Sequence, residues 1–171
     1  MQSIDDQITE IIQSFAQNLP QFKDGRINYS SSNEAPVLTV FVMYKNKLLL
    51  LQRSNQVRTY QGKWNTVAGY LDDYHQTLKE KIHEELYEET GITPQIIQNY
   101  FYGSCYQFTD NKSNKTWIVF PAKVILIKKP TITLDWEHTK YQWIKAEDIS
   151  SFDTVPNLRK SLSSILHREN K

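Results

Sequence analysis

The chain has 171 residues, with 20 basic and 19 acidic side chains and a formal net charge of +1. The length suits one domain with a substantial core, and the balanced charge excludes a whole-molecule attraction to nucleic acid or to an acidic membrane. The single cysteine, Cys105, excludes an intrachain disulfide and favours a reducing compartment. Residues 1–19 contain Asp5, Asp6 and Glu10 and no long apolar run. We therefore predict neither a signal peptide nor a membrane span, and we expect a cytoplasmic location.

The N-terminal segment has the pattern of a helix followed by a connector. Isoleucine and phenylalanine recur at helical spacing, which predicts an amphipathic helix over residues 4–18, ended by Pro20. Residues 20–35 are rich in serine and asparagine and are typical of turns. We therefore divide the chain into residues 1–35, a helix and connector, and residues 36–171, a single globular unit.

A β-hairpin is predicted next. Val37–Tyr44 and Lys47–Gln52 are apolar and rich in β-branched residues, and the turn-like pair Lys45-Asn46 separates them. A polar loop, Arg53–Lys63, then leads to a short predicted strand at Trp64–Ala68.

The central predicted helix has clear start and stop signals. Thr77 and Glu80 have the spacing of a capping box, and the helix runs to about Thr90. Gly91 is placed to end it in a left-handed conformation. Its buried stripe comprises three residues spaced one turn apart: Leu78, Ile82 and Leu86.

The second half is predicted to be mostly strands, at Ile96–Cys105, Thr116–Ile127 and Tyr141–Ile144. Short helices are predicted at Glu147–Ser150 and Asn157–His167. Because strands and helices interleave around one core, we expect an α/β sandwich of mixed sheets with flanking helices.

The central helix carries clustered glutamates. Glu85, Glu88 and Glu89 fall at i, i+3 and i+4, so their carboxylates share one edge of the helix, with Glu84 about 100° away around the axis. Like charges this close repel each other, and a hard dication such as Mg²⁺ would relieve that repulsion. The alternative reading of the glutamates alone is a solvated acidic face.

The stretch Gly69–Ile92 resembles the Nudix box, G-x5-E-x7-R-E-U-x-E-E-x-G-U with U aliphatic. Its second half, Glu85-Leu86-Tyr87-Glu88-Glu89-Thr90-Gly91-Ile92, matches E-U-x-E-E-x-G-U in full. The resemblance implies a Nudix-type α/β/α sandwich, here with an additional N-terminal helix. It also implies that Glu85, Glu88 and Glu89 bind Mg²⁺ or Mn²⁺ together with the backbone carbonyl near Gly69.

Three positions depart from the box. Its leading glycine falls on Tyr70, one residue after Gly69, its first glutamate falls on Gln76, and its arginine falls on Glu84. In the family, that glutamate and arginine help to orient the metal-binding carboxylates. Changes to such supporting groups cost about 10–100-fold in other metal sites. We therefore expect the departures to affect catalytic efficiency.

The resemblance extends over residues 37–155. Leu48–Ser54 and Gly62–Gly69 are similar to the segments that lead into the box, and Glu137-His138 before Tyr141–Ile144 is similar to the family's later loop and closing strand.

The resemblance implies a Mg²⁺-dependent pyrophosphohydrolase that cleaves the diphosphate linkage of a nucleoside diphosphate linked to another moiety. Glu88 and Glu89 would bind the metal, and Glu85 would be a further ligand or would position the attacking water. Glu137 is the main candidate for the general base or an extra ligand, with His138 as its competitor.

Basic and aromatic side chains are the candidates for substrate binding. Arg53 follows an apolar strand and is placed to hold a phosphate, unless it forms an ordinary ion pair at the strand end. Arg58 and Lys63 would add positive charge, or are solvated loop residues. Three aromatic side chains are candidates to stack on a base, although packed aromatic residues are commoner: Tyr60, Phe108 and Trp117.

Two other functions stay open at this point. The departures at Gln76 and Glu84 suit a non-catalytic Nudix module that senses nucleotides. An isopentenyl-diphosphate isomerase-like enzyme would need a cysteine at its site, and Cys105 lies far from the box in sequence. We expect a small-molecule substrate and neither nucleic acid nor membrane as a partner, and the sequence leaves a homodimer open.

Overall fold

The computed structural model describes residues 1–168. Its elements, in chain order, are α1 (Ile4–Ala16), β1 (Glu34–Tyr44), β2 (Lys47–Arg53), β3 (Trp64–Asn65), β4 (Val67–Tyr70), α2 (Leu78–Thr90), the 3-10 helix η1 (Pro94–Ile96), β5 (Ile97–Tyr102), β6 (Tyr106–Asp110), β7 (Lys115–Leu126), β8 (His138–Lys145), the 3-10 helix η2 (Ala146–Ser151) and α3 (Leu158–Ile165).

The β1–β2 hairpin and α2 form where the sequence predicts them, and the predicted turn and capping residues have the expected geometry. Lys45 and Asn46 have φ angles of 45° and 61°, which a tight turn between β1 and β2 requires of both central residues. The Thr77 hydroxyl accepts from the backbone N–H of Glu80, and the Glu80 carboxylate accepts from the backbone N–H of Thr77, so the capping box is complete. Gly91 ends α2 with φ 74°.

The predicted strand Ile96–Cys105 is wrong at its C-terminal end. β5 ends at Tyr102, and a separate strand, β6, begins at Tyr106. Both strands pair antiparallel with β7, β5 with its second half and β6 with its first. Pro121 lies between the two paired stretches and has no N–H to give to a ladder, so the neighbouring strand breaks where Gly103 passes it.

Other boundaries also differ from prediction. β1 begins at Glu34 rather than Val37, β8 spans His138–Lys145 rather than Tyr141–Ile144, and α3 spans Leu158–Ile165 rather than Asn157–His167. The first helix ends at Ala16 rather than at residue 18, and the segment Trp64–Ala68 divides into β3 and the start of β4. The two short strands pair with different partners, β3 with β2 and β4 with β1.

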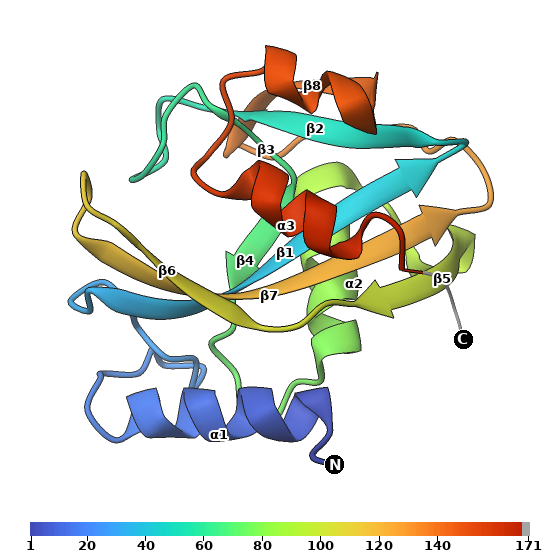
Figure 1. Ribbon diagram of the computed structural model, residues 1–171. Helices are drawn as coiled ribbons and strands as arrows, with labels where there is room; N and C mark the ends of the chain where they lie inside the picture. The colour runs from blue at the N-terminus through green and yellow to red at the C-terminus, as the bar shows by residue number, and fades with distance from the viewer. Residues whose placement is uncertain (169–171) are drawn as a thin grey trace.

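The centre of the sheet is a long parallel pair, β1 and β7, in register from Glu34 and Thr116 to Met43 and Ile125. The other edge of β1 pairs first with β4 and then with β2, and β8 lies beyond β2. Each central strand therefore has two partners along its outer edge. β1 pairs with β4 and then β2, and β7 pairs with β6 and then β5 (Figure 1).

Helices cover the two faces of the sheet, α2 on one and α3 on the other, while α1 lies below the sheet in the view of Figure 1. Alternation along β1 sends Leu38 and Val40 into the cluster with α2, and Phe41 into the cluster with α3. The predicted buried stripe of α2 is at most 1% exposed at each of its three residues. The α/β/α sandwich with mixed strand pairing and an N-terminal helix is confirmed.

The N-terminal helix packs into the same core as the sheet. Ile8 and Ile12 belong to the cluster that contains the stripe of α2. The Asp5 carboxylate accepts a hydrogen bond from the backbone N–H of Leu78, at 2.8 Å, so α1 caps the first turn of α2. The boundary expected between residues 35 and 36 falls inside β1.

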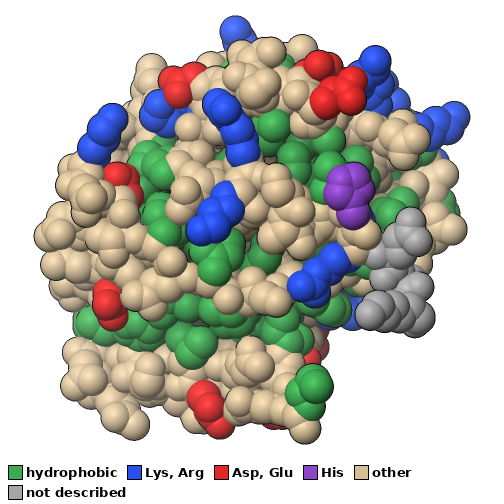
Figure 2. All heavy atoms as spheres, viewed as in Figure 1, with side chains coloured by type: hydrophobic (Ala, Val, Ile, Leu, Met, Phe, Trp, Pro, Cys, Tyr) green, Lys and Arg blue, Asp and Glu red, His purple; other side chains and the backbone are tan. Residues whose placement is uncertain are grey.

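The face that carries α3 has basic and acidic side chains interspersed with apolar ones (Figure 2). This mixture agrees with the formal net charge of +1. Among residues 1–168, no helix combines the length and the apolar character that a membrane crossing needs.

Candidate active site

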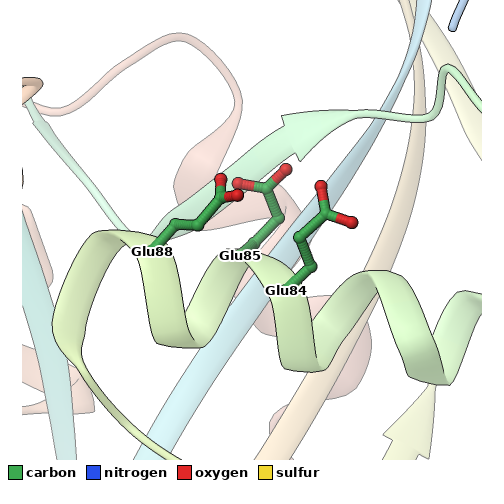
Figure 3. Close-up of side chains that lie close together, drawn as sticks. All are labelled: Glu84, Glu85 and Glu88. Carbon is green, nitrogen blue, oxygen red and sulfur yellow. The ribbon is translucent and has the colours of Figure 1, made fainter. Parts of the chain in front are cut away.

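Three carboxylates meet on one edge of α2. One oxygen from each of Glu84, Glu85 and Glu88 lies within 4.8 Å of the other two. Figure 3 shows the three side chains rising from the same side of the helix. Glu85 is 8% exposed, and burial raises its pKa to about 7 although Lys81 opposes the shift. The three carboxylates therefore lie close enough together to hold one metal ion.

Gly69 allows Glu85 to lie against β4. A Cβ atom at Gly69 would collide with the carboxylate of Glu85. Only glycine therefore leaves room for this contact, which brings the backbone of β4 beside the acidic cluster. This close approach gives a physical reason for glycine at the start of the box-like stretch.

Lys81 is the cation of the cluster. Its ammonium lies 2.7 Å from Glu85, 3.0 Å from Glu84 and 3.6 Å from Asp72, and the residue is 3% exposed. Burial alone would lower the pKa of Lys81, but Glu85 and Asp72 hold it above its ordinary value. Sequence reasoning missed Lys81, although its i,i+4 spacing to Glu85 predicts an ion pair on a helix.

Two of the three departures from the box, Gln76 and Glu84, contact each other. The side-chain amide of Gln76 donates to the Glu84 carboxylate at 2.5 Å. Burial opposes ionisation of Glu84, but this bond and the Lys81 ammonium hold its pKa below the ordinary value. The two box positions are therefore linked here by an amide and a carboxylate, and Lys81 supplies a positive charge from the preceding turn.

Glu89 lies deeper than the other three glutamates. It is 4% exposed, its carboxylate is 3.4 Å from the backbone N–H of Ala68, and it is 4.0 Å from the ring of His138. Burial, followed by the charges of Glu85 and Glu137, raises its pKa well above the ordinary value. His138 in turn contacts Asp135 at 2.9 Å. The expected role of Glu89 as a metal ligand stays a prediction.

Arg53 and Glu137 interact electrostatically at the cavity. Both line the same cavity as Glu85 and Glu88. Burial raises the pKa of Glu137, the Asp135 carboxylate adds to the shift, and Arg53 opposes it. The Arg53 side chain also donates to the Thr59 carbonyl at 3.0 Å, which fixes its direction. The structure thus brings both predicted residues to the acidic cluster.

The other two predicted basic residues are not among those that line the cavity. Lys63 pairs with Asp153 at 2.7 Å, and both side chains are exposed. Arg58 is exposed in the loop before β3 and lies outside the lining of the cavity. Their assignment to substrate binding gains no support from these positions.

The cavity beside the glutamates has a volume of about 330 Å³. Its acidic part is formed by α2 and β4, and its other part is lined by aromatic side chains that include Tyr60, Phe108 and Trp117. The connector also contributes Arg26, which sequence reasoning missed because nothing local relates residues 20–33 to the helix.

The amino-acid sequence matches a known protein family over most of its length. Residues 34–165 match the family model described as the NUDIX domain. The chain belongs to the NUDIX family. No curated protein sequence matches the chain.

Solved structures of this family share its fold. A MutT protein from Methanosarcina mazei Go1 is 25% identical, with a TM-score of 0.62, over 76% of this chain and 91% of that one. A C. elegans Ap4A hydrolase, solved as a binary complex, is 17% identical with a TM-score of 0.60, over 76% and 93% of the two chains. The NUDIX domain of Shewanella oneidensis NrtR, solved with ADP ribose, is 13% identical with a TM-score of 0.64, over 89% and 94%. Family membership and these neighbours support a pyrophosphohydrolase enzyme.

The residues present suit a hard divalent cation. Three carboxylates offer oxygen ligands within reach of one another, and the glycine at position 69 keeps the space beside Glu85 free of a side chain. Burial raises the pKa values of Glu85 and Glu89 and so disfavours their charged forms, which a bound cation would stabilise.

Proposed function

We propose that this NUDIX protein is a Mg²⁺-dependent hydrolase that cleaves the diphosphate linkage of a nucleoside diphosphate joined to another moiety. The observation that carries the proposal is the carboxylate cluster of Glu84, Glu85 and Glu88 in a cavity that also contains Arg53 and Glu137. Acidic groups suit the metal, and a guanidinium suits the phosphate.

The metal would be held by Glu85 and Glu88, with Glu89 and the carbonyl near Gly69 as the further expected ligands. Bound there, Mg²⁺ would neutralise charge that develops on the phosphoryl oxygens and would help to activate water. Glu84 is the additional carboxylate that the structure places within reach of Glu85 and Glu88.

We assign phosphate binding, proton transfer and positioning of the carboxylates to Arg53, Glu137 and Lys81. Arg53 lines the cavity, its Nε donates to the Thr59 carbonyl, and its other guanidinium nitrogens would bind a phosphate. Glu137 has a raised pKa and lines the cavity, which suits a group that accepts a proton from the attacking water. Lys81 holds Glu84 and Glu85 on one side of α2, so it acts by positioning these carboxylates.

Turnover of a panel of compounds tests the proposal. The panel contains nucleoside triphosphates, dinucleoside polyphosphates and nucleotide sugars, each assayed by phosphorus NMR with Mg²⁺ and with excess EDTA. We expect hydrolysis of at least one compound with Mg²⁺, and its loss with EDTA. Persistence of the same rate in EDTA would refute the metal dependence.

The variant Glu88→Gln gives a matched test, since Glu88 is exposed and its carboxylate faces the cluster. We expect turnover to fall by about 100-fold or more, as for loss of a group that acts on the transition state. The melting temperature should stay unchanged. Glu147→Gln, on η2, is the control and should retain wild-type turnover. A Glu88→Gln enzyme with a wild-type rate would overturn the metal assignment.

A nucleotide-sensing module without turnover is the second candidate, favoured by the Lys81 ammonium that pairs with the buried Glu85 at 2.7 Å. Saturable binding of a panel compound that stays intact over hours with Mg²⁺ would support it. The isomerase-like alternative gains no support, because Cys105 is exposed between β5 and β6 and lies outside the cavity lining.

A further inference from the structure

A second cavity lies beside α3, on the side of the sheet that α3 covers. Its volume is about 1430 Å³, and it is bounded by the β1–β2 turn, parts of β5, β7 and β8, η2 and one side of α3. The glutamate-bearing helix α2 covers the opposite face of the sheet (Figure 1). The two cavities share no lining residue, so this one is separate from the candidate active site.

The floor of this second cavity is apolar. Met43, Phe101, Ile125, Leu162 and Leu166 line it, and all five belong to or pack against the hydrophobic cluster beneath α3. Met43 and Ile125 are direct partners in the parallel register of β1 and β7, so their side chains lie next to each other on one face. This floor suits an occupant that has apolar groups of its own.

The rim of the cavity is basic. Among the described residues that line it, Glu147 is the one acidic side chain, whereas the lysine and arginine side chains are Lys45, Lys47, Lys123, Lys145, Arg159 and Arg168. The whole chain has 20 basic and 19 acidic side chains, so this excess is local. Figure 2 shows Lys and Arg side chains at the upper right of the face, where the β1–β2 hairpin ends in Figure 1. A concentrated positive rim favours a negatively charged partner.

Two of these lysines lie directly opposite each other. Lys47 on β2 is the antiparallel partner of Lys145 on β8. Like charges in directly opposed positions destabilise a sheet. Within residues 1–168, neither lysine forms an ion pair, and Arg159 on α3 forms none either. A bound carboxylate would relieve the repulsion between the two lysines.

Lys123 neutralises the end of α3 at this cavity. Its ammonium donates to the carbonyls of Leu166 and Arg168, at 2.8 and 2.9 Å, and lies 4.4 Å from the centre of the Phe101 ring. Carbonyls at a helix C-terminus carry partial negative charge and would repel an anion. Because Lys123 binds these carbonyls, they do not offset the positive charge of the rim.

We propose that this cavity binds an acidic segment of a partner protein, with apolar side chains of the segment on the floor and its carboxylates against Lys47, Lys145 and Arg159. The volume exceeds the roughly 300–1,000 Å³ of pockets for small ligands, which favours a peptide over a small anion. The aliphatic floor favours a peptide over an RNA strand, because RNA has no aliphatic side chains to bury there.

A designed peptide tests the proposal on the full chain. The peptide has a central Leu-Phe pair with three acidic residues on each side, and its ends are acetylated and amidated. Fluorescence anisotropy of a labelled form measures its affinity at low and at physiological salt. We expect saturable binding that weakens as salt rises, since exposed charges are screened. Absence of saturable binding at low salt would overturn the proposal.

Three further probes separate the contribution of charge from that of the apolar floor. They are the same peptide with lysines in place of the acidic residues, the acidic peptide with a central Gly-Gly pair, and a uridine-rich RNA oligonucleotide. We expect each to bind about tenfold more weakly than the designed peptide, or weaker still. Equal or tighter binding of any of the three would overturn the proposal, because the cavity would then respond to charge alone or to apolar surface alone.

Charge reversals locate the bound peptide. Lys145→Glu and Arg159→Glu should each weaken binding about tenfold, because each sets a carboxylate against the acidic segment. Lys145→Glu should also raise the melting temperature, since it replaces the repulsion of Lys47 by an attraction across the strands. Lys140→Glu is the control with the same change in net charge, exposed on the same strand and outside the cavity lining, and it should keep wild-type affinity. Wild-type affinity in both Lys145→Glu and Arg159→Glu, or an equal loss in Lys140→Glu, would refute the site.

Glu88→Gln separates this site from the proposed active site. Since the two cavities have no lining residue in common, this variant should bind the peptide with wild-type affinity whether or not the protein hydrolyses any compound. A changed affinity would place the peptide at the glutamate cavity and overturn the proposal.

Discussion

At the scale of single residues, Gly69 decides how closely Glu85 can approach β4. Its Cα faces the Glu85 carboxylate, where a methyl group would collide. Since its backbone dihedrals lie outside the left-handed region, the requirement for glycine here comes from space and not from backbone conformation.

Gly69→Ala tests this contact. The added methyl group should displace the Glu85 carboxylate and weaken Mn²⁺ binding about 10–100-fold, the range seen when supporting groups of metal sites are altered. Electron paramagnetic resonance of free Mn²⁺ measures the affinity, and circular dichroism checks the fold. An affinity within twofold of the wild type would show that Glu85 does not need this space.

Gln76 and Glu84 show how two departures from the box compensate each other. Gln76→Glu alone would set two carboxylates against each other, and Glu84→Arg alone would set two cations together beside Lys81. The double variant restores an ion pair. We expect each single variant to lose about 1 kcal/mol of unfolding free energy, with a coupling of about 0.5–3 kcal/mol that favours the double variant.

Urea unfolding of the wild type, both single variants and the double variant measures this cycle. Additive effects of the two substitutions would mean that the contact between the side chains has no energetic weight.

At the scale of elements, a carboxylate on α1 caps the first turn of α2. Asp5 accepts from the backbone N–H of Leu78 at 2.8 Å, across 73 positions in the chain. The first turn of a helix has N–H groups without intrahelical partners, and this carboxylate satisfies one of them. The added N-terminal helix is thereby linked to the helix that carries the glutamates.

Asp5→Ala should lower the free energy of unfolding by about 0.5–2 kcal/mol, as for loss of other helix caps. Glu10→Ala is the control, because Glu10 is exposed on the same helix. Chemical denaturation measures both. Equal stability of the two variants would show that the bond to Leu78 contributes nothing.

At the scale of the whole molecule, residues 1–33 and the sheet share one core. Ile12 on α1 is 1% exposed and packs in the cluster that includes Leu78 and Ile82. We therefore propose that the N-terminal segment and the hydrolase unit unfold together, as one cooperative transition.

Ile12→Ala should cost about 2–5 kcal/mol, the range for truncating a buried isoleucine. Ile127→Ala, at a residue that is 58% exposed, should stay within about 0.5 kcal/mol of the wild type. Thermal unfolding followed by both far-UV and near-UV circular dichroism would show one shifted transition. Two separate transitions would mean that α1 is an independent unit.

The sequence by itself determined the elements whose signals lie within a few residues. The capping box at Thr77, the left-handed Gly91 and the turn at Lys45-Asn46 depend on neighbouring backbone atoms, and each is in the predicted place. The helix period also predicted an acidic edge on α2, but the three carboxylates that meet there include Glu84 in place of Glu89.

Tertiary structure alone decided which distant groups meet. The break between β5 and β6 depends on Pro121 in the strand beside them, and the cavity joins Asn65 to Trp117 through strand pairing that no local pattern records. The depth of Glu89 depends on how α2 packs against β4, where the Ala68 backbone N–H faces its carboxylate. Such contacts arise from sheet register and burial, which act between segments far apart in the chain and not within a window of sequence.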